Sequence, residues 1–292
     1  MVTPRFPVVI VDVSEDEADL ASFELFELGA TGIEVRDATT LAKGKEGRQT
    51  LVASFADDAR ATAALDSLPE AWSPRQDAIV GDAWRDEYKK YFHPFLLCKD
   101  LVVRPPWEAY APKEGERVLT LEPGRAFGTG LHETTSLVAE TLAEHSVELR
   151  GKRVLDVGTG SGILALVALL LGADRARAID VDPDAVSVAR ENAVANDLQG
   201  RLTADGATLE GLTELYPIVV ANIEAGVLEG MAPALAGRAE PGALVVLSGI
   251  LAPPASDQVP NLLAAYASFE HLETKTKGEW AALILRARRS ER

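Results

Sequence analysis

The composition of this 292-residue chain excludes several classes of protein before any motif is considered. The length suffices for two domains, 47% hydrophobic residues can build their cores, and a single cysteine excludes an internal disulfide and indicates a reducing compartment. The net charge of −16 opposes extended contact with nucleic acid, and no apolar run reaches transmembrane length. The four histidines are scattered, so we expect no metal site, no membrane anchor and a cytoplasmic location. The charge could attract a basic protein partner, or it could equally serve solubility alone.

Residues 1–80 show strand and helix patterns in the order βαββαβ. An apolar run at 7–13 predicts a strand, and Ser14 to Glu17 forms the capping box of a helix that ends near Leu28. The remaining elements are strands at 32–35, 51–55 and 77–80 and an alanine-rich helix at 57–68. This order predicts a small α+β domain of the ferredoxin-like type. It holds no catalytic constellation, so we expect it to recognise a substrate or to pack.

The range 81–100 is expected to link this domain to a second one at 101–292. Residues 83–92 (AWRDEYKKYF) carry aromatic side chains near helical spacing, which predicts a bridging helix. Short strands are expected at 101–103 and 118–121.

A glycine-rich loop, EPGRAFGTGLHETT at 122–135, follows these strands. Gly128 and Gly130 flank Thr129, and residues 133–135 have the composition of a helix N-terminus. Such a loop can fold over a cofactor, or it can be only a turn that joins domains; its glycine and hydroxyl residues favour binding. We assign no catalytic role to His132, because a lone loop histidine more often forms hydrogen bonds or packs.

The central motif is RVLDVGTGSGILA at 153–165, a strand that runs into a turn with Gly158, Gly160 and Gly162. Alternating glycines allow a sharp turn and let a ligand approach backbone N–H groups at a helix N-terminus. Asp156, in an otherwise apolar strand, would be costly to bury without a polar partner. The dinucleotide fingerprint needs glycine where this chain has Ile163. An acid followed by G-x-G-x-G instead resembles motif I of class I S-adenosylmethionine (SAM)-dependent methyltransferases.

A second strand, RAIDVDPD at 177–184, ends in carboxylates. Asp180 lies 22 positions after Gly158 (180 − 158 = 22), near the interval of roughly 20 residues at which a ribose-binding acid occurs. Asp180 or Asp182 could instead only cap the helix predicted at 183–195. We assign Asp180 to the ribose and Asp182 to the cap.

Two later strands also end in polar side chains. The strand at 201–204 leads to Asp205, which could accept a hydrogen bond from an adenine amino group or could equally be a solvated turn carboxylate. The strand IVVANI at 218–223 contains Asn222 at the sheet edge where α/β proteins bind ligands. Its amide oxygen and the following carbonyls can hold an amine but cannot act as a base. The predicted sheet is completed by a strand at 245–250, a helix at 254–266 and an antiparallel pair at 269–275 and 280–286.

Together these segments resemble the PrmA family of bacterial ribosomal protein L-11 methyltransferases. The most specific segment is the AFGTG-x-H-x-T-T loop beside motif I, and the others are W-x₃-Y-K-x-Y-F, AIDVDP, VVANI, LSGIL and GEW. The chain departs from the pattern on the substrate side, where Arg125 replaces an expected methionine and Glu224 replaces a common apolar residue. The resemblance implies an α/β fold, with the Rossmann-like seven-stranded sheet of class I methyltransferases behind a ferredoxin-like domain.

The resemblance also implies a reaction and a partner. SAM would donate methyl groups to lysine ε-amines and to the N-terminal α-amine of free L-11. Residues 1–80 would bind L-11, and the enzyme would be a monomer. Asn222 and the Ile223 carbonyl would orient the acceptor nitrogen. The implied cofactor contacts are Phe127, Gly128, Thr129, Gly130, Thr134, Asp156, Gly158, Thr159, Gly160, Asp180, Val181, Asp205 and Asn222.

Three other functions stay open on the sequence. The chain could methylate another protein amine, a small molecule or RNA, although its charge and the lack of an N-P-P-[YF] motif after Asn222 disfavour a nucleic-acid base. It could be an NAD-dependent oxidoreductase, which Ile163 opposes. It could also be a SAM-binding module without activity, which the intact glycines, Asp180 and Asn222 oppose.

Overall fold

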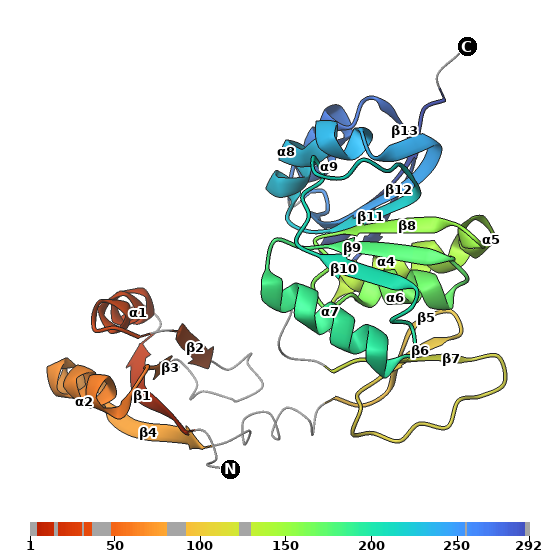
Figure 1. Ribbon diagram of the computed structural model, residues 1–292. Helices are drawn as coiled ribbons and strands as arrows, with labels where there is room; N and C mark the ends of the chain where they lie inside the picture. Colours follow the sequence, from red (N-terminus) through yellow and green to blue (C-terminus); the bar gives the residue numbers. More distant parts are fainter. Residues whose placement is uncertain are drawn as a thin grey trace. The chain divides into compact units, whose positions relative to one another are not determined.

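The computed structural model describes residues 5–14, 17–30, 32–36, 48–80, 92–122, 130–254 and 256–289 (Figure 1). The chain separates into two compact units, Met1–Tyr91 and Phe92–Arg292. Each unit has its own hydrophobic core. The bridging helix predicted at 83–92 lies, apart from Phe92, outside the described residues. No helix in the described ranges is long and apolar enough to cross a bilayer.

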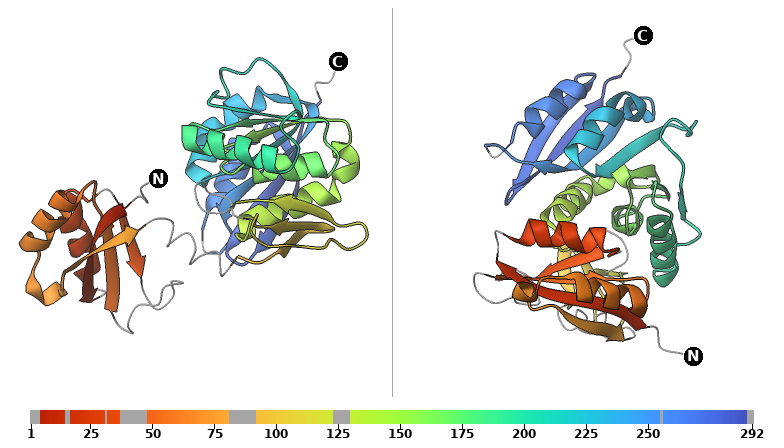
Figure 2. Two further views of the ribbon diagram at one scale, coloured as in Figure 1. Left: turned by 60° about the horizontal axis from the view of Figure 1, so that its bottom comes forward. Right: turned by 90° about the vertical axis from the view of Figure 1, so that its left-hand side faces the viewer.

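The first unit is a four-stranded antiparallel sheet with two α-helices on one face (Figure 2). Its elements are β1 (Arg5–Ser14), α1 (Ala18–Glu27), β2 (Gly32–Arg36), β3 (Arg48–Ser54), α2 (Asp58–Ser67), the 3₁₀ turn η2 (Glu70–Trp72) and β4 (Arg75–Val80). The strands lie in the order β2-β3-β1-β4. Val9, Val11 and Val13 alternate along β1 and are fully buried in one cluster with residues of both helices.

The second unit is built on a seven-stranded sheet in the order β10-β9-β8-β11-β12-β14-β13. Its elements are β5 (Phe95–Cys98), β6 (Leu101–Arg104), β7 (Arg117–Thr120), α4 (Glu133–Glu144), α5 (Ser146–Leu149), β8 (Arg153–Val157), α6 (Ile163–Leu170), β9 (Arg175–Ile179), α7 (Pro183–Ala195), β10 (Leu202–Asp205), β11 (Tyr216–Asn222), α8 (Ala225–Ala236), β12 (Ala239–Leu251), α9 (Gln258–Ala265), β13 (Phe269–Lys277) and β14 (Trp280–Ala287). The strands from β10 to β12 pair in parallel, whereas β14 is antiparallel to both β12 and β13.

Helices cover both faces of this sheet. Successive residues of a strand point to opposite faces, so Val220 of β11 packs in a cluster with α4, α6 and α7, and Val219 packs in a cluster with α8 and α9. A strand that is buried on both faces has apolar residues at successive positions, and this explains the continuous apolar run of β11 in the sequence.

Residues 95–98, which the sequence analysis places in the linker, form β5 of the second unit. This strand pairs with β6, which pairs with β7, in a separate three-stranded sheet. Four residues are too few to show a period, so this strand carries no sequence signal.

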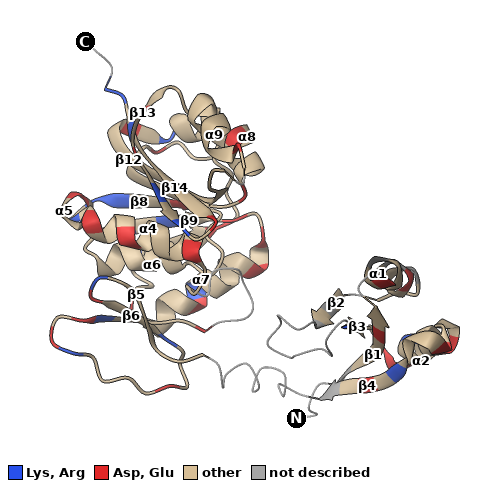
Figure 3. Cartoon of the chain, turned by 180° about the vertical axis from the view of Figure 1, so that it is seen from behind, with Lys and Arg blue, Asp and Glu red and all other residues tan. Residues whose placement is uncertain are grey.

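Ion pairs join α4 and α5 to the last two strands of the sheet. Acidic positions recur along α4 and α5 (Figure 3). Glu140 and Glu144, four residues apart, lie on one face of α4, and Glu148 follows on α5. The pairs are Glu140–Lys277 (3.0 Å), Glu144–Lys275 and Glu148–Arg286 (2.7 Å). They hold the β13–β14 hairpin, which carries Trp280, against the helix whose first turn carries Thr134 and Thr135.

Candidate active site

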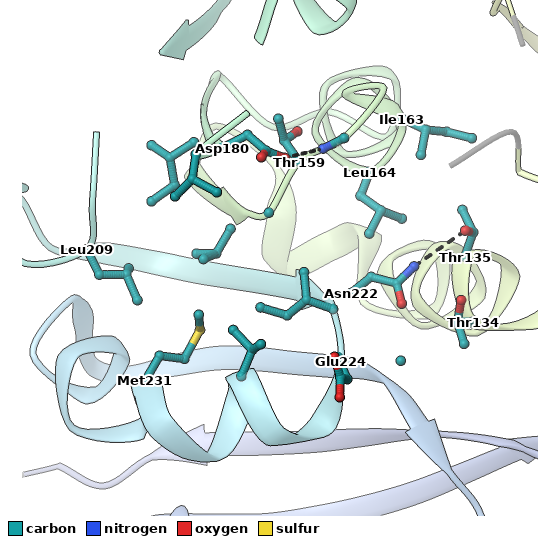
Figure 4. Close-up of a pocket in the computed structure, with 18 of the residues that line it drawn as sticks. Thr134, Thr135, Thr159, Ile163, Leu164, Asp180, Leu209, Asn222, Glu224 and Met231 are labelled. Carbon is teal, nitrogen blue, oxygen red and sulfur yellow. Dashed lines mark hydrogen bonds between the residues drawn. The ribbon is translucent and has the colours of Figure 1, made fainter. Parts of the chain in front are cut away.

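A cavity of about 840 Å³ lies at the carboxyl ends of β8, β9 and β11 (Figure 4). Its walls come from the first turn of α4, the glycine turn after β8, the residues after β9 and β10, the junction of β11 with α8, the end of β12 and Trp280. Parallel α/β sheets bind ligands at this edge, because the strand ends leave a crevice there.

The glycine turn after β8 fits closely against its neighbours. Gly158, Gly160 and Gly162 have φ values of +67°, +54° and +80°, which favour glycine. A Cβ at Gly158 would lie 2.4 Å from Cγ2 of Ile223, and one at Gly162 would lie 3.0 Å from Cβ of Ala189. The glycines therefore let β11 and α7 approach the turn.

Asp156 holds this turn from inside the protein. Its Oδ2 accepts hydrogen bonds from Thr159 Oγ1 (2.6 Å) and from the Ala165 N–H (3.1 Å). The side chain is 1% exposed, and Oδ1 has no hydrogen-bond partner among the described residues. Burial raises the pKa of Asp156 to about 6 against the lowering effect of the two hydrogen bonds. Asp156 does not line the cavity, so it shapes the turn from behind.

Asp180 follows β9 and lines the cavity. Its Oδ2 accepts from the Gly160 N–H (2.9 Å) and its Oδ1 from the Asp182 N–H (3.0 Å). Each oxygen keeps a lone pair for ligand hydroxyls. Because Asp180 occupies the Gly160 N–H, that amide does not face a phosphate. Asp182 caps α7 by accepting from the Asp184 N–H (2.9 Å), and Val181 is exposed at the cavity rim.

Asp205, at the end of β10, does not line the cavity. Its Oδ2 pairs with Arg177 (2.6 Å) and its Oδ1 accepts from the Ala207 N–H (3.0 Å). Each oxygen thus has one partner and keeps a second lone pair, as in Asp180. The two alternatives raised by the sequence, an adenine acceptor and a turn carboxylate, both stay predictions. Residues 207–210 line the cavity in its place.

Asn222 ends β11 and faces the first turn of α4. Its Nδ2 donates to Thr135 Oγ1 (3.4 Å), and its Oδ1 is buried without a hydrogen-bond partner among the described residues. Figure 4 shows this side chain pointing into the space next to Thr134 and Thr135. A buried carbonyl oxygen without a donor is costly, so this atom marks a place for a ligand N–H.

The backbone after Asn222 is fixed between two glycines. Ile223 packs its side chain over Gly158, and its N–H donates to the Ser248 carbonyl (3.1 Å). A Cβ at Gly249, where φ is +87°, would lie 2.2 Å from the Ile223 carbonyl oxygen. Only glycine at position 249 leaves room for this carbonyl.

His132 is the N-cap of α4. Its Nδ1 accepts from the Thr134 N–H (3.4 Å) and lies 2.8 Å from Thr134 Oγ1. Its ring meets that of Trp280 edge-on at 4.8 Å. These contacts give His132 a capping and packing role.

The predicted site residues divide into three groups. Those that line the cavity are Thr134, Gly158, Thr159, Gly160, Asp180, Val181, Asn222 and Ile223. Asp156, Asp205 and Gly130 do not line it; at Gly130 a Cβ would lie 2.9 Å from Cδ1 of Ile163. Phe127, Gly128 and Thr129, like Arg125, lie outside the described residues.

Most of the apolar lining was not predicted from the sequence; it comes from α6, α8, the loop after β10, the end of β12 and the start of β14. These residues include Leu164, Leu209, Val227, Met231, Leu251 and Trp280. Only the position of the loop after Asp205, at a strand end, could have indicated them. The ionisable lining residues are His132, Asp180, Glu210 and Glu224, with no Lys or Arg in the described wall. The cavity therefore suits a cationic ligand and disfavours a polyphosphate.

Comparison with known proteins places the chain in a family. Residues 6–288 match the family described as "Ribosomal protein L11 methyltransferase (PrmA)". The chain is 54% identical over 277 residues to the ribosomal protein L11 methyltransferase of Sorangium cellulosum, covering 93% of this chain and 87% of that protein. It is 36% identical over 305 residues to that of Pelobacter propionicus, covering 97% and 98%. The crystal structure of ribosomal protein L11 methylase from Lactobacillus delbrueckii subsp. bulgaricus matches with a TM-score of 0.61 and 31% identity over 68% of this chain and 100% of that one. The chain thus belongs to the ribosomal protein L11 methyltransferase family, and its second unit has the class I methyltransferase fold.

Proposed function

We propose that the protein transfers methyl groups from SAM to lysine ε-amines and to the N-terminal α-amine of ribosomal protein L11. The observation that carries the proposal is the buried, unpartnered Oδ1 of Asn222, in the same cavity as Asp180 and the glycine turn. An acceptor amine supplies the N–H that this oxygen lacks. Membership of the L11 methyltransferase family supports L11 as the partner.

The residues of the cavity fit SAM. Asp180 offers lone pairs to the ribose hydroxyls, and the apolar lining suits the purine ring. The wall holds three carboxylates and no basic side chain in its described part, which suits a ligand with a sulfonium and an ammonium group. When bound, SAM supplies an electrophilic methyl group on this positively charged sulfur.

The chain's own residues then have to align a neutral amine. Methyl transfer depends on geometry, and the amine must carry its lone pair. An α-amine has a pKa of about 8, whereas a lysine, at about 10.4, has to lose its proton through desolvation, which lowers the pKa. Asn222 accepts from the amine without a charge that would stabilise the ammonium form, and its bond to Thr135 sets the orientation of the amide. The released proton passes to water, since His132 is engaged with Thr134.

The proposal assigns recognition of L11 to residues 1–80. This range belongs to a compact unit with its own core. A substrate bound there would present its amines to the second unit. The proposal includes a cytoplasmic location, which a free ribosomal protein as substrate requires, and a monomeric enzyme.

The test is incubation of purified L11 with the enzyme and isotopically labelled SAM, followed by mass spectrometry. We expect methyl increments on lysines and on the N-terminus. L11 with its amines blocked by acetylation is the control and should stay unlabelled. Label on carboxyl or hydroxyl groups, or on ribosomal RNA in place of L11, would contradict the proposal.

A further inference from the structure

We propose that Glu224 is a specificity-determining residue, which draws a positively charged acceptor amine to the cavity; this inference rests on the proposed function. Glu224 lies two residues after Asn222 and lines the same cavity. The two side chains would act in succession, Glu224 on the ammonium form and Asn222 on the neutral form.

The carboxylate of Glu224 has no structural task in the described part of the chain. The residue is the N-cap of α8, but its side chain makes no capping hydrogen bond. Its backbone carbonyl alone begins the helix, by accepting from the N–H groups of Val227 (3.1 Å) and Leu228 (3.0 Å). The side chain is exposed and, among the described residues, forms no ion pair. A glutamate at an N-cap is a weaker choice than Asp, Ser, Thr or Asn, so the capping position does not explain it.

The position of Glu224 within the cavity indicates what it meets. Figure 4 shows Glu224 on the side of Asn222 away from Asp180. Glu224 lies there at the start of α8, apart from the acid that is assigned to the ribose. The other ionisable side chains facing the cavity are His132, Asp180 and Glu210. None of these carboxylates is neutralised by a lysine or arginine of the described wall, so Glu224 adds to a field that attracts cations.

A carboxylate and an amide have opposite effects on a lysine. The carboxylate stabilises the ammonium form, which is the form that arrives from water. The uncharged Asn222 oxygen accepts equally from a neutral amine and does not hold the proton in place. Glu224 therefore favours binding of cationic acceptors over neutral ones and contributes nothing to the methyl-transfer step. Its removal should change KM and leave kcat unchanged or higher.

The experiment compares the full-length parent enzyme with Glu224→Gln. Glu229→Gln is the matched control, because it removes one charge from the same helix at a residue that does not line the cavity. For L11 methylation, we expect Glu224→Gln to raise KM about three- to tenfold without lowering kcat, and this difference should shrink in about 0.5 M salt. Glu229→Gln should match the parent. KM for L11 is measured at saturating SAM, so that a change in SAM affinity does not enter it. A fall in kcat, or an equal effect of Glu229→Gln, would overturn the proposal.

A binding measurement separates this inference from the proposed function. The probes are Nα-acetyl-lysine amide and its uncharged analogue Nα-acetyl-norleucine amide, titrated into the enzyme saturated with S-adenosylhomocysteine. The parent should bind the lysine probe about three- to tenfold more tightly, and Glu224→Gln should lose this preference. Preference without methylation of L11 would refute the proposed substrate and support the role of Glu224. Methylation of L11 by a parent enzyme without the preference would refute the role of Glu224 alone.

Discussion

At the scale of single residues, Asn222 offers the sharpest test of how the acceptor is held. The Asn222→Asp variant is nearly isosteric but carries a charge that stabilises the ammonium form of the amine. We expect turnover to fall about tenfold or more at neutral pH with SAM affinity almost unchanged, and part of the loss to be recovered as pH rises. Rates at two pH values and calorimetry with SAM measure this.

The Asn222→Ala variant serves as the comparison for this prediction. It should also lose turnover, but without recovery at higher pH, because the variant lacks positioning and adds no charge. If instead both variants lose SAM binding and melting temperature in step with activity, Asn222 only stabilises the end of β11. That result would remove it from the acceptor site.

Asp156 predicts a pH dependence of stability. Its pKa is about 6 in the folded protein against 3.8 for an ordinary aspartate. The folded state therefore holds the proton more strongly, so the contribution of Asp156 is fully present below pH 4 and is lost as pH rises through 6. The loss is roughly 2–4 kcal/mol in the free energy of unfolding. An Asp156→Asn variant keeps an acceptor for Thr159 and the Ala165 N–H but does not ionise. Its melting temperature should therefore rise relative to that of the parent as the pH is raised from 4 to 7. Parallel melting curves across this range would contradict the prediction.

At the scale of elements, the end of β12 controls the place of Ile223. In a Gly249→Ala variant the new Cβ would meet the Ile223 carbonyl oxygen at 2.2 Å, and φ of +87° is itself unfavourable for alanine. We expect a loss of about 2–4 kcal/mol in unfolding free energy and a large loss of turnover. Gly230→Ala on α8 is the control, since nothing lies within 4 Å of its Cβ. It should be neutral or stabilising by about 0.5–1 kcal/mol.

The ion pairs between α4, α5 and the last strands give a second prediction for elements. The Arg286 guanidinium, with help from His145, lowers the pKa of Glu148 to about 2. A lowered pKa contributes stability above pH 4.5 that is lost as pH falls toward 2. Because the Glu148 side chain is 42% exposed, the pair is worth only about 0.5–1 kcal/mol. Glu148→Gln should thus melt slightly below the parent at pH 7, with the gap closing below pH 4 and in 1 M salt. A gap that is independent of pH would refute this account.

The sequence predicted elements well where the signal is local and poorly where packing decides. The helix at 183–195 begins with the Asp182 cap and Pro183, and the structure has it as α7 with these bounds. Helix α8 was not predicted, because it contains two glycines and Pro233, which oppose a helix. It forms because Leu228 and Leu235 are buried against the sheet. The same division holds in the site: polar residues at strand ends were found, and the apolar wall from α8 was not.

At the scale of the whole molecule, the two units should separate in function. We expect a fragment of residues 92–292 to keep SAM affinity and to lose most methylation of L11, since the cavity and its supporting core lie within this range. Circular dichroism should confirm that the fragment is folded. Weak methylation of a short lysine peptide should persist, because the chemistry resides in this unit. Full activity of the fragment on intact L11 would refute recognition by residues 1–80.

The absence of lysine and arginine from the described wall of the cavity also bears on turnover. Methyl transfer moves the positive charge from the sulfur of the cofactor to the acceptor nitrogen, which becomes a methylammonium. The three carboxylates of this mostly apolar wall therefore attract the spent cofactor less strongly than the fresh one. The same charge that loads the cavity thus favours exchange of the product for a new methyl donor. For a substrate with several target amines, this exchange has to occur once for each methyl group.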